Sequence, residues 1–182
     1  MVRRFVLARN NIWITLAQIA VFAALTALAA RITIPLPNTP VPITLQTMAV
    51  VLAGLMLGAR GGALSQLAYL SAIAVGLPLD AYARGSAALA GPTAGYLWAF
   101  IPAAFVAGFI AERAPWPSLL SRLVGSLAGM AVIYALGAGW LMAISPNVNT
   151  LAIAWAAGIA PFILPDLAKA VVAALVAEGT LR

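Results

Sequence analysis

The chain has no cysteine and no histidine, and it carries little charge of either sign. Without cysteine it forms no disulfide and offers no thiolate nucleophile or thiolate metal ligand. Without histidine it lacks the commonest metal ligand and the base best suited to neutral pH. The four acidic residues are scattered along the chain. We therefore expect a protein that is not an enzyme and that has no metal and no cofactor.

Charged residues make up only 8% of the 182 residues, and hydrophobic residues make up 64%. A soluble domain has about 25% charged residues, so this chain cannot cover its surface with polar groups and is predicted to be an integral membrane protein. Its net charge of +6 comes from scattered arginines rather than from a basic patch, so we expect no nucleic-acid partner. We expect one transmembrane domain over residues 1–182.

Six apolar segments, separated by proline, glycine and charge, predict an all-α bundle of six transmembrane helices. They cover approximately residues 11–30, 43–57, 62–75, 93–111, 118–144 and 151–177. The second and third are shorter than the ~20 residues that cross a bilayer core, and the glycine-rich stretch 58–62 predicts a tight turn between them. Irregular backbone within the membrane must line a cavity, so we expect a ligand pocket closed by the first and third outer loops.

The arginines predict how the bundle is oriented. With six spans, one side holds both termini and the second and fourth loops, and the other side holds only Arg31 and Arg84. The arginines of the first side are Arg3, Arg4, Arg9, Arg60, Arg113, Arg122 and Arg182. We therefore expect cytoplasmic N- and C-termini, a pocket that opens outward, and a multi-pass protein of a prokaryotic plasma membrane.

The last apolar segment holds the only lysine of the chain, Lys169, three residues after Asp166. Residues at this spacing share a helix face, so the two charged groups can meet. Ionisable groups at membrane depth are costly and by default mark a substrate or ion site. Pro161 and Pro165 deprive earlier carbonyls of their helical partners, which fits a broken helix beside a cavity. A structural ion pair between helices is the alternative.

The outer loops supply further candidate binding residues. A proline-rich stretch, 35–42, is expected to be extended, and Thr44 and Gln46 follow it, although Thr44 can also cap a helix. In the third loop, a turn at residues 91–93 leads into a helix start whose N–H groups can receive a polar ligand. The candidates in that loop are Tyr82, Arg84, Gly91, Thr93 and Tyr96. The alternatives are an Arg84–Asp80 pair and an interfacial position for Tyr96.

Small residues four positions apart recur in the first segment, as Ala20 with Ala24 and Ala23 with Ala27. This spacing lets another helix approach closely. That helix belongs either to a partner protein or to the same chain.

Three stretches resemble signature segments of a known family: residues 37–46 (PNTPVPITLQ), 91–97 (GPTAGYL) and 166–169 (DLAK). The family is BioY, the biotin-specific substrate-binding (S) components of energy-coupling factor (ECF) transporters. The resemblance covers nearly the whole chain. It implies six helices around one biotin near the outer face. It also implies that the alanine-rich first helix docks a transmembrane coupling protein, which acts with two cytoplasmic ATPase subunits.

The candidate residues suit the chemistry of biotin, which has a carboxylate at one end and a neutral ureido ring at the other. Lys169 or Arg84 can hold the carboxylate, because charge-assisted bonds are strong in a water-poor pocket. Asp166, Gln46 and Thr44 can hydrogen-bond polar groups, and the two tyrosines can pack on the rings. Which end of biotin meets Asp166 and Lys169 stays open. We therefore expect a high-affinity biotin-binding component for uptake.

Other functions remain as alternatives. The chain has no GxxxxGK[ST] loop and so cannot hydrolyse ATP in the usual way; active transport then needs partners, unless the chain acts alone or as a homo-oligomer. An S component for another small vitamin is the nearest alternative, because the same scaffold can select another ligand. An ion channel is the other, but its pore should carry polar residues along its length, whereas those here cluster at one end.

Overall fold

The structure is a computed structural model, and it describes residues 11–181. It is mostly helical, as predicted from the sequence. The elements in chain order are α1 (Ile12–Ala29), β1 (Thr33–Ile34), β2 (Ile43–Thr44), α2 (Gln46–Ala74), η1 (Gly85–Leu89), α3 (Ala94–Arg113), α4 (Ser118–Ile144), α5 (Leu151–Gly158), η2 (Ala160–Phe162) and α6 (Ile163–Leu181).

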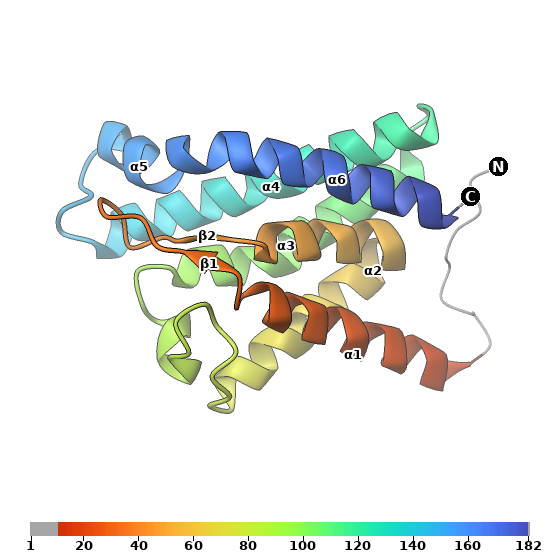
Figure 1. The fold of residues 1–182 in the computed structure, drawn as a ribbon, viewed down its shortest axis with the longest axis horizontal. Coiled ribbons are helices and arrows are strands. Elements are labelled where there is room, and N and C mark those ends of the chain that lie inside the picture. The colour runs from red at the N-terminus through yellow and green to blue at the C-terminus, as the bar shows by residue number, and fades with distance from the viewer. Residues whose placement is uncertain (1–10, 182) are drawn as a thin grey trace.

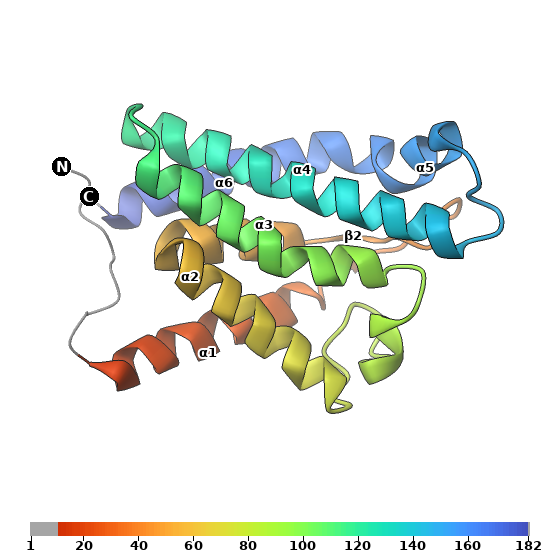
Figure 2. The ribbon, with the colours of Figure 1, turned by 180° about the vertical axis from the view of Figure 1, so that it is seen from behind.

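Within residues 11–181, five helical stretches are long and apolar enough to cross a membrane. They are α1, α2, α3, α4 and the combined stretch Leu151–Leu181. The helices lie side by side with their long axes roughly aligned (Figures 1 and 2). The start of α1 and the end of α6 lie at one end of the bundle, and the β1–β2 hairpin lies toward the other (Figure 1).

Helix α2 folds back on itself at Gly58, the one residue within it with non-helical dihedral angles. A Cβ added to Gly62 would lie 2.6 Å from the Cα of Gly54, whereas residues eight apart in a straight α-helix are about 12 Å apart. The sequence therefore located this reversal correctly but predicted too long a turn. Only Gly58 leaves the helix, and Arg60 to Gly62 already belong to its second leg.

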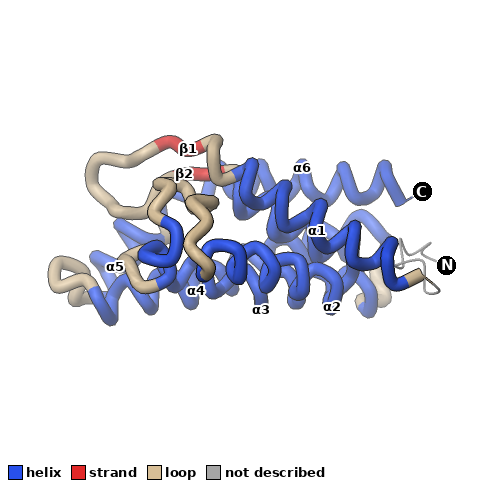
Figure 3. Tube along the Cα trace, turned by 90° about the horizontal axis from the view of Figure 1, so that it is seen from below, coloured by secondary structure: helices blue, strands red, loops and turns tan. Residues whose placement is uncertain are grey.

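The first leg of α2 begins in the middle of the bundle, and β2 leads into it (Figure 1). The sequence predicted a helix from residue 43, and this boundary was wrong: Ile43 and Thr44 pair with Ile34 and Thr33 in an antiparallel hairpin. The four prolines of the loop that joins the two strands lack N–H groups and favour extended backbone. The hairpin lies beside the helices, toward the end of the bundle where α5 lies, as seen from below in Figure 3.

The last apolar segment is broken where Pro161 predicted a break. Helix α5 ends at Gly158, the short helix η2 follows, and α6 then continues to Leu181. Pro165 lies in the first turn of α6, where a missing N–H costs no helical hydrogen bond. The break places the first turn of α6, with Asp166, deep in the bundle.

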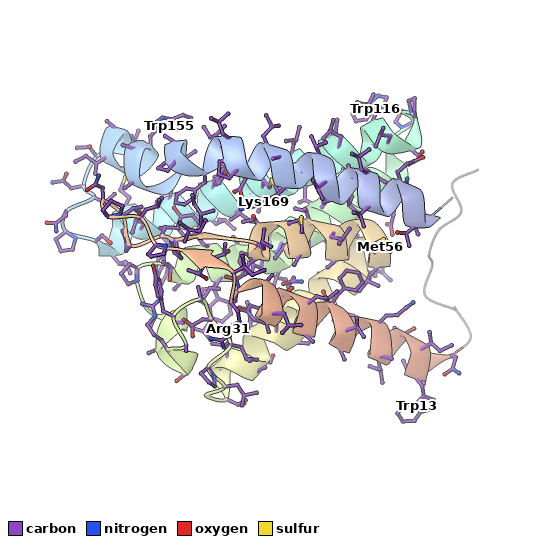
Figure 4. The ribbon with its side chains drawn as sticks, in the orientation of Figure 1. Trp13, Arg31, Met56, Trp116, Trp155 and Lys169 are labelled. Carbon is purple, nitrogen blue, oxygen red and sulfur yellow. The ribbon has the colours of Figure 1, made fainter. Side chains whose placement is uncertain are left out.

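The helices bury a small-residue core and expose apolar side chains on their outer faces. Trp13, Trp116 and Trp155 point outward, Trp13 and Trp116 near one end of the bundle and Trp155 near the other, whereas Lys169 lies inside (Figure 4). Tryptophan favours the two interfaces of a membrane. These features define a multi-pass membrane protein.

A buried ion pair joins α4 to α6 far from the hairpin. Arg122 pairs with Glu178, and Ser118 donates a hydrogen bond of 2.9 Å to the same carboxylate. Both charged side chains are buried, so their pairing offsets part of the hydration that each has lost.

Candidate ligand-binding site

A cavity of about 630 Å³, including its open mouth, lies among the hairpin, the loop after α2 and helices α3, α4 and α6. The residues that line it are Val41, Pro42, Thr44, Gln46, Thr47, Asp80, Ala81, Tyr82, Arg84, Thr93, Tyr96, Leu97, Phe100, Ile133, Tyr134, Phe162, Asp166 and Lys169. Both outer loops named in the sequence analysis therefore contribute to its wall.

Asp166 and Lys169 form an ion pair in the first two turns of α6, with 2.6 Å between Lys169 Nζ and Asp166 Oδ1. Both side chains are buried. The Lys169 ammonium also donates at 2.7 Å to the carbonyl oxygen of Thr44, which precedes α2. The pair therefore ties α6 to the start of α2 and faces the cavity at the same time.

Thr47 and Tyr134 also bond to the Asp166 carboxylate, and neither residue was predicted from the sequence. The Thr47 hydroxyl donates to Asp166 Oδ1 at 3.0 Å, and the Tyr134 hydroxyl donates to Oδ2 at 2.7 Å. The signal available in the sequence was polarity inside apolar segments, because Tyr134 is the only tyrosine of its segment and Thr47 directly follows Gln46.

Gln46 and Thr44 stand at the entry to α2. The Thr44 hydroxyl accepts a hydrogen bond from the Gln46 N–H at 3.2 Å, so Thr44 helps to start the helix as well as lining the cavity. The Gln46 amide donates to the hydroxyl of Tyr69 at 2.7 Å, which in turn donates to the carbonyl oxygen of Leu79. This chain of bonds connects the helix start to the outer loop and fixes the Gln46 side chain.

The loop between α2 and α3 carries Asp80 and Arg84, which form an ion pair at 3.6 Å. This pair was the alternative role predicted for Arg84 from the sequence. The Asp80 carboxylate also accepts the backbone N–H groups of Tyr82 and Gly85. Arg84 donates to Thr93 at 3.0 Å and stacks over the Tyr82 ring at 5.3 Å. The Arg84 side chain keeps 36% of its surface exposed, so a cation with spare donors lies in the cavity wall.

Tyr96 lines the cavity from α3, and its ring packs against Gly137 of α4, which has no side chain to obstruct it. Its hydroxyl donates at 2.9 Å to the carbonyl of Gly158, the last residue of α5. This phenol therefore satisfies a carbonyl at the helix break. The interfacial alternative for Tyr96 is wrong, because its side chain is buried.

Gly91 is the one predicted ligand-contacting residue that the structure does not place in the cavity wall. Its carbonyl accepts hydrogen bonds from Trp140 and from the N–H of Ala94, and Arg84 lies beside its Cα. Gly91 thus belongs to the layer behind Arg84. Every other predicted ligand-contacting residue lines the cavity, although their contacts with a ligand stay predictions.

The four alanines of α1 divide into two pairs. Ala23 and Ala27 pack against the buried core, so this pair serves the same chain. Ala20 and Ala24 are exposed. Only the second pair is available to a partner helix.

The arrangement suits reversible binding of a small polar molecule. Apolar and aromatic walls surround two internally balanced ion pairs, which can hold a ligand through charge-assisted hydrogen bonds. Among residues 11–181, no cluster of three or more histidine, cysteine, aspartate or glutamate side chains could hold a metal ion. Fold and site together define a membrane-embedded receptor for a small polar solute.

The comparisons with known proteins identify the family. The model of the BioY family matches residues 5–182, and the chain belongs to this family. It is 41% identical over 163 residues to a biotin transporter BioY of Thermotoga maritima, covering 89% of this chain and 92% of that protein. It is 44% identical over 171 residues to a biotin transporter BioY of Rhodobacter capsulatus, covering 88% and 89%.

A solved structure has the same fold. The S-component for biotin from an ECF-type ABC transporter superposes with a TM-score of 0.80 at 28% sequence identity. The match covers 91% of this chain and 89% of the solved one. These relatives are transporters.

Proposed function

We propose that this protein is the high-affinity biotin-binding component of an uptake system, with residues 1–182 as its single substrate-binding domain. The observation that carries the proposal is the buried Asp166–Lys169 pair in the wall of a cavity that aromatic and polar side chains also line. A buried ion pair is weak support for stability alone, but its position beside a cavity fits recognition of a polar guest. The names and fold of the relatives agree with this function.

Within this proposal, the carboxylate of biotin meets Arg84 and the ureido ring meets Asp166. A ligand carboxylate beside Asp166 would bring two like charges together, and Lys169 is already engaged with Thr44 and Asp166. Arg84 has five N–H donors in a planar fork that suits a carboxylate, and its partner Asp80 also accepts backbone N–H groups. A ureido N–H is the neutral donor that Asp166 can accept without repulsion.

The proposed uptake system includes a transmembrane coupling protein and two cytoplasmic ATPase subunits, because the sequence lacks a phosphate-binding loop. The biotin component has no cofactor and catalyses no reaction itself. A homo-oligomer of the biotin component would appear as a larger species in size-exclusion chromatography of the purified protein. This assembly belongs in the plasma membrane of a prokaryote.

In this membrane the protein crosses six times, with the two legs of α2 counted separately and both termini in the cytoplasm. Arg60 follows the reversal of α2, and Arg113 and Arg122 flank the α3–α4 connection, so all three support a cytoplasmic face at this end of the bundle. The arginines Arg3, Arg4, Arg9 and Arg182, on which the same orientation depends, lie outside the described residues.

The test is binding of radiolabelled biotin to the purified full-length protein. The wild type should bind saturably, and unlabelled biotin should compete whereas riboflavin or thiamine should not. The double variant Lys169→Ala/Asp166→Asn should bind about 100-fold more weakly, because each charged hydrogen bond contributes about 1.5–3 kcal/mol. Gly179→Ala, on an open face of α6, is the matched control. Absence of saturable binding by the wild type would refute the proposal, and competition by another vitamin would assign a different ligand.

A further inference from the structure

The Asp166 carboxylate is held from three helices at once. Lys169 on α6 and Thr47 on α2 donate to Oδ1 at 2.6 and 3.0 Å, and Tyr134 on α4 donates to Oδ2 at 2.7 Å. Removing one helix would free the carboxylate to rotate. Its orientation is therefore a property of the assembled bundle rather than of α6.

These donors leave the carboxylate little spare capacity. An ionised carboxylate offers about four acceptor positions on its two oxygens, and the donors described above occupy two on Oδ1 and one on Oδ2. The remaining position is on Oδ2, next to the Tyr134 hydroxyl. Since Asp166 and Tyr134 both line the cavity, Asp166 can accept one further N–H there.

Lys169 supplies the complementary donor. Its ammonium has three N–H groups, which point to Thr44 O at 2.7 Å, Asp166 Oδ1 at 2.6 Å and Thr47 Oγ1 at 3.4 Å. The bond to Thr47 is the longest and hence the weakest. A ligand carbonyl can take over this donor at little cost, so the site offers one acceptor and one donor close together.

We propose that Tyr134 is a positioning residue that makes Asp166 selective for a ligand N–H adjacent to a carbonyl, as in a cyclic urea. The inference rests on the proposed function, whose ureido ring has this pair of groups. The Tyr134 hydroxyl fixes Oδ2 and fills one of its two acceptor positions. Without it the carboxylate rotates, a second position opens, and the preference for the correctly placed N–H falls.

The test compares Tyr134→Phe with the wild type, both as purified full-length protein, against three probes. These are biotin, biotin methylated on its ureido nitrogens, and biotin methyl ester. The variant should bind biotin about tenfold more weakly, and the preference for biotin over the N-methylated compound should shrink by a similar factor. The preference for biotin over the methyl ester should not change, because the Tyr134 hydroxyl bonds to Asp166, whereas the carboxylate is proposed to meet Arg84.

Further variants separate positioning from general damage. Ser65→Ala also removes one buried hydroxyl, which bonds to the Gly62 carbonyl away from the cavity lining, and it should leave the N-methyl preference as in the wild type. Thr47→Val should reduce the preference for biotin over the N-methylated compound, and Thr47→Ser should restore it. These variants test whether the donors to Asp166 set that preference if Tyr134→Phe does not fold. An unchanged N-methyl preference in the folded Tyr134 or Thr47 variants overturns the inference while wild-type biotin binding stands. Failure of the wild type to bind biotin instead overturns the proposed function.

Discussion

At the scale of single residues, the site separates two kinds of charge. The Asp166–Lys169 pair is buried and held by Thr44, Thr47 and Tyr134, whereas Arg84 is partly exposed and lies 3.6 Å from Asp80. An arginine with unused donors can accept a new anion without breaking its existing contacts. The two ends of an asymmetric ligand should therefore respond to different substitutions.

Replacing Arg84 by glutamine tests this separation. The variant should lose about tenfold in affinity for biotin and little for biotin methyl ester, because the ester carries no charge for Arg84 to pair with. Competition binding against radiolabelled biotin measures both affinities. Equal losses for the acid and the ester would place the carboxylate elsewhere in the cavity.

The Arg122–Glu178 pair illustrates a structural ion pair in the same protein. Arg122→Met should lower the free energy of unfolding by about 3 kcal/mol, because it leaves Glu178 charged and buried. The double variant Arg122→Met/Glu178→Met should lose much less than the single variant, since it removes both charges of the buried pair. Thermal unfolding in detergent gives the double-mutant cycle; a double variant as unstable as the sum of the two single variants would contradict this account.

At the scale of secondary-structure elements, local signals in the sequence predicted the helices well. The segment 118–144 is bounded by a proline before it and polar residues after it, and α4 has the same bounds. Gly58 and Pro161 correctly marked the reversal of α2 and the break before α6. These are backbone effects of single residues, which a sequence displays directly.

The parts that could not be predicted depend on contacts between distant residues. The β1–β2 hairpin pairs two short strands across a proline-rich loop. Strands of two residues are too short to show an alternating hydrophobic pattern in the sequence. Thr47 meets Asp166 across 119 positions of sequence, and Tyr134 meets it across 32. Lys169 and Asp166 stood out because charge is rare in this chain, whereas a hydroxyl in an apolar helix is a weaker signal.

Gly58 supplies a prediction at this scale. Its dihedral angles, φ 77° and ψ 177°, lie in a region that is essentially restricted to glycine. Gly58→Ala should therefore destabilise the protein by about 1–3 kcal/mol, also because the new methyl group would meet the Glu112 carboxylate. Gly179→Ala, in an open helical position, should be neutral or stabilising. Thermal unfolding in detergent compares the stabilities of the two variants. Equal stabilities would mean that the reversal of α2 needs no glycine at position 58.

At the scale of the whole molecule, α1 is the helix least enclosed by the bundle. Only 6% of the most apolar 18-residue stretch of α1 is buried, against 56% for the corresponding stretches of α2 and α3. Ala23 and Ala27 face the core, and Ala20 and Ala24 lie on the exposed face. One face of α1 thus serves the fold and the other is free to contact lipid or another protein.

This division predicts opposite consequences for the two alanine pairs. The double variant Ala20→Leu/Ala24→Leu should bind biotin as the wild type does but should co-purify at least tenfold less with a transmembrane coupling protein, because the larger side chains prevent close helix approach. Ala23→Leu should instead destabilise the isolated protein, since overpacking a tight interface costs about 1–3 kcal/mol. Co-purification of the expressed complex, with biotin binding measured on the same samples, distinguishes the two effects. Undiminished complex formation by the Ala20/Ala24 variant would show that the coupling protein docks on another surface, and α1 would then present that face only to lipid.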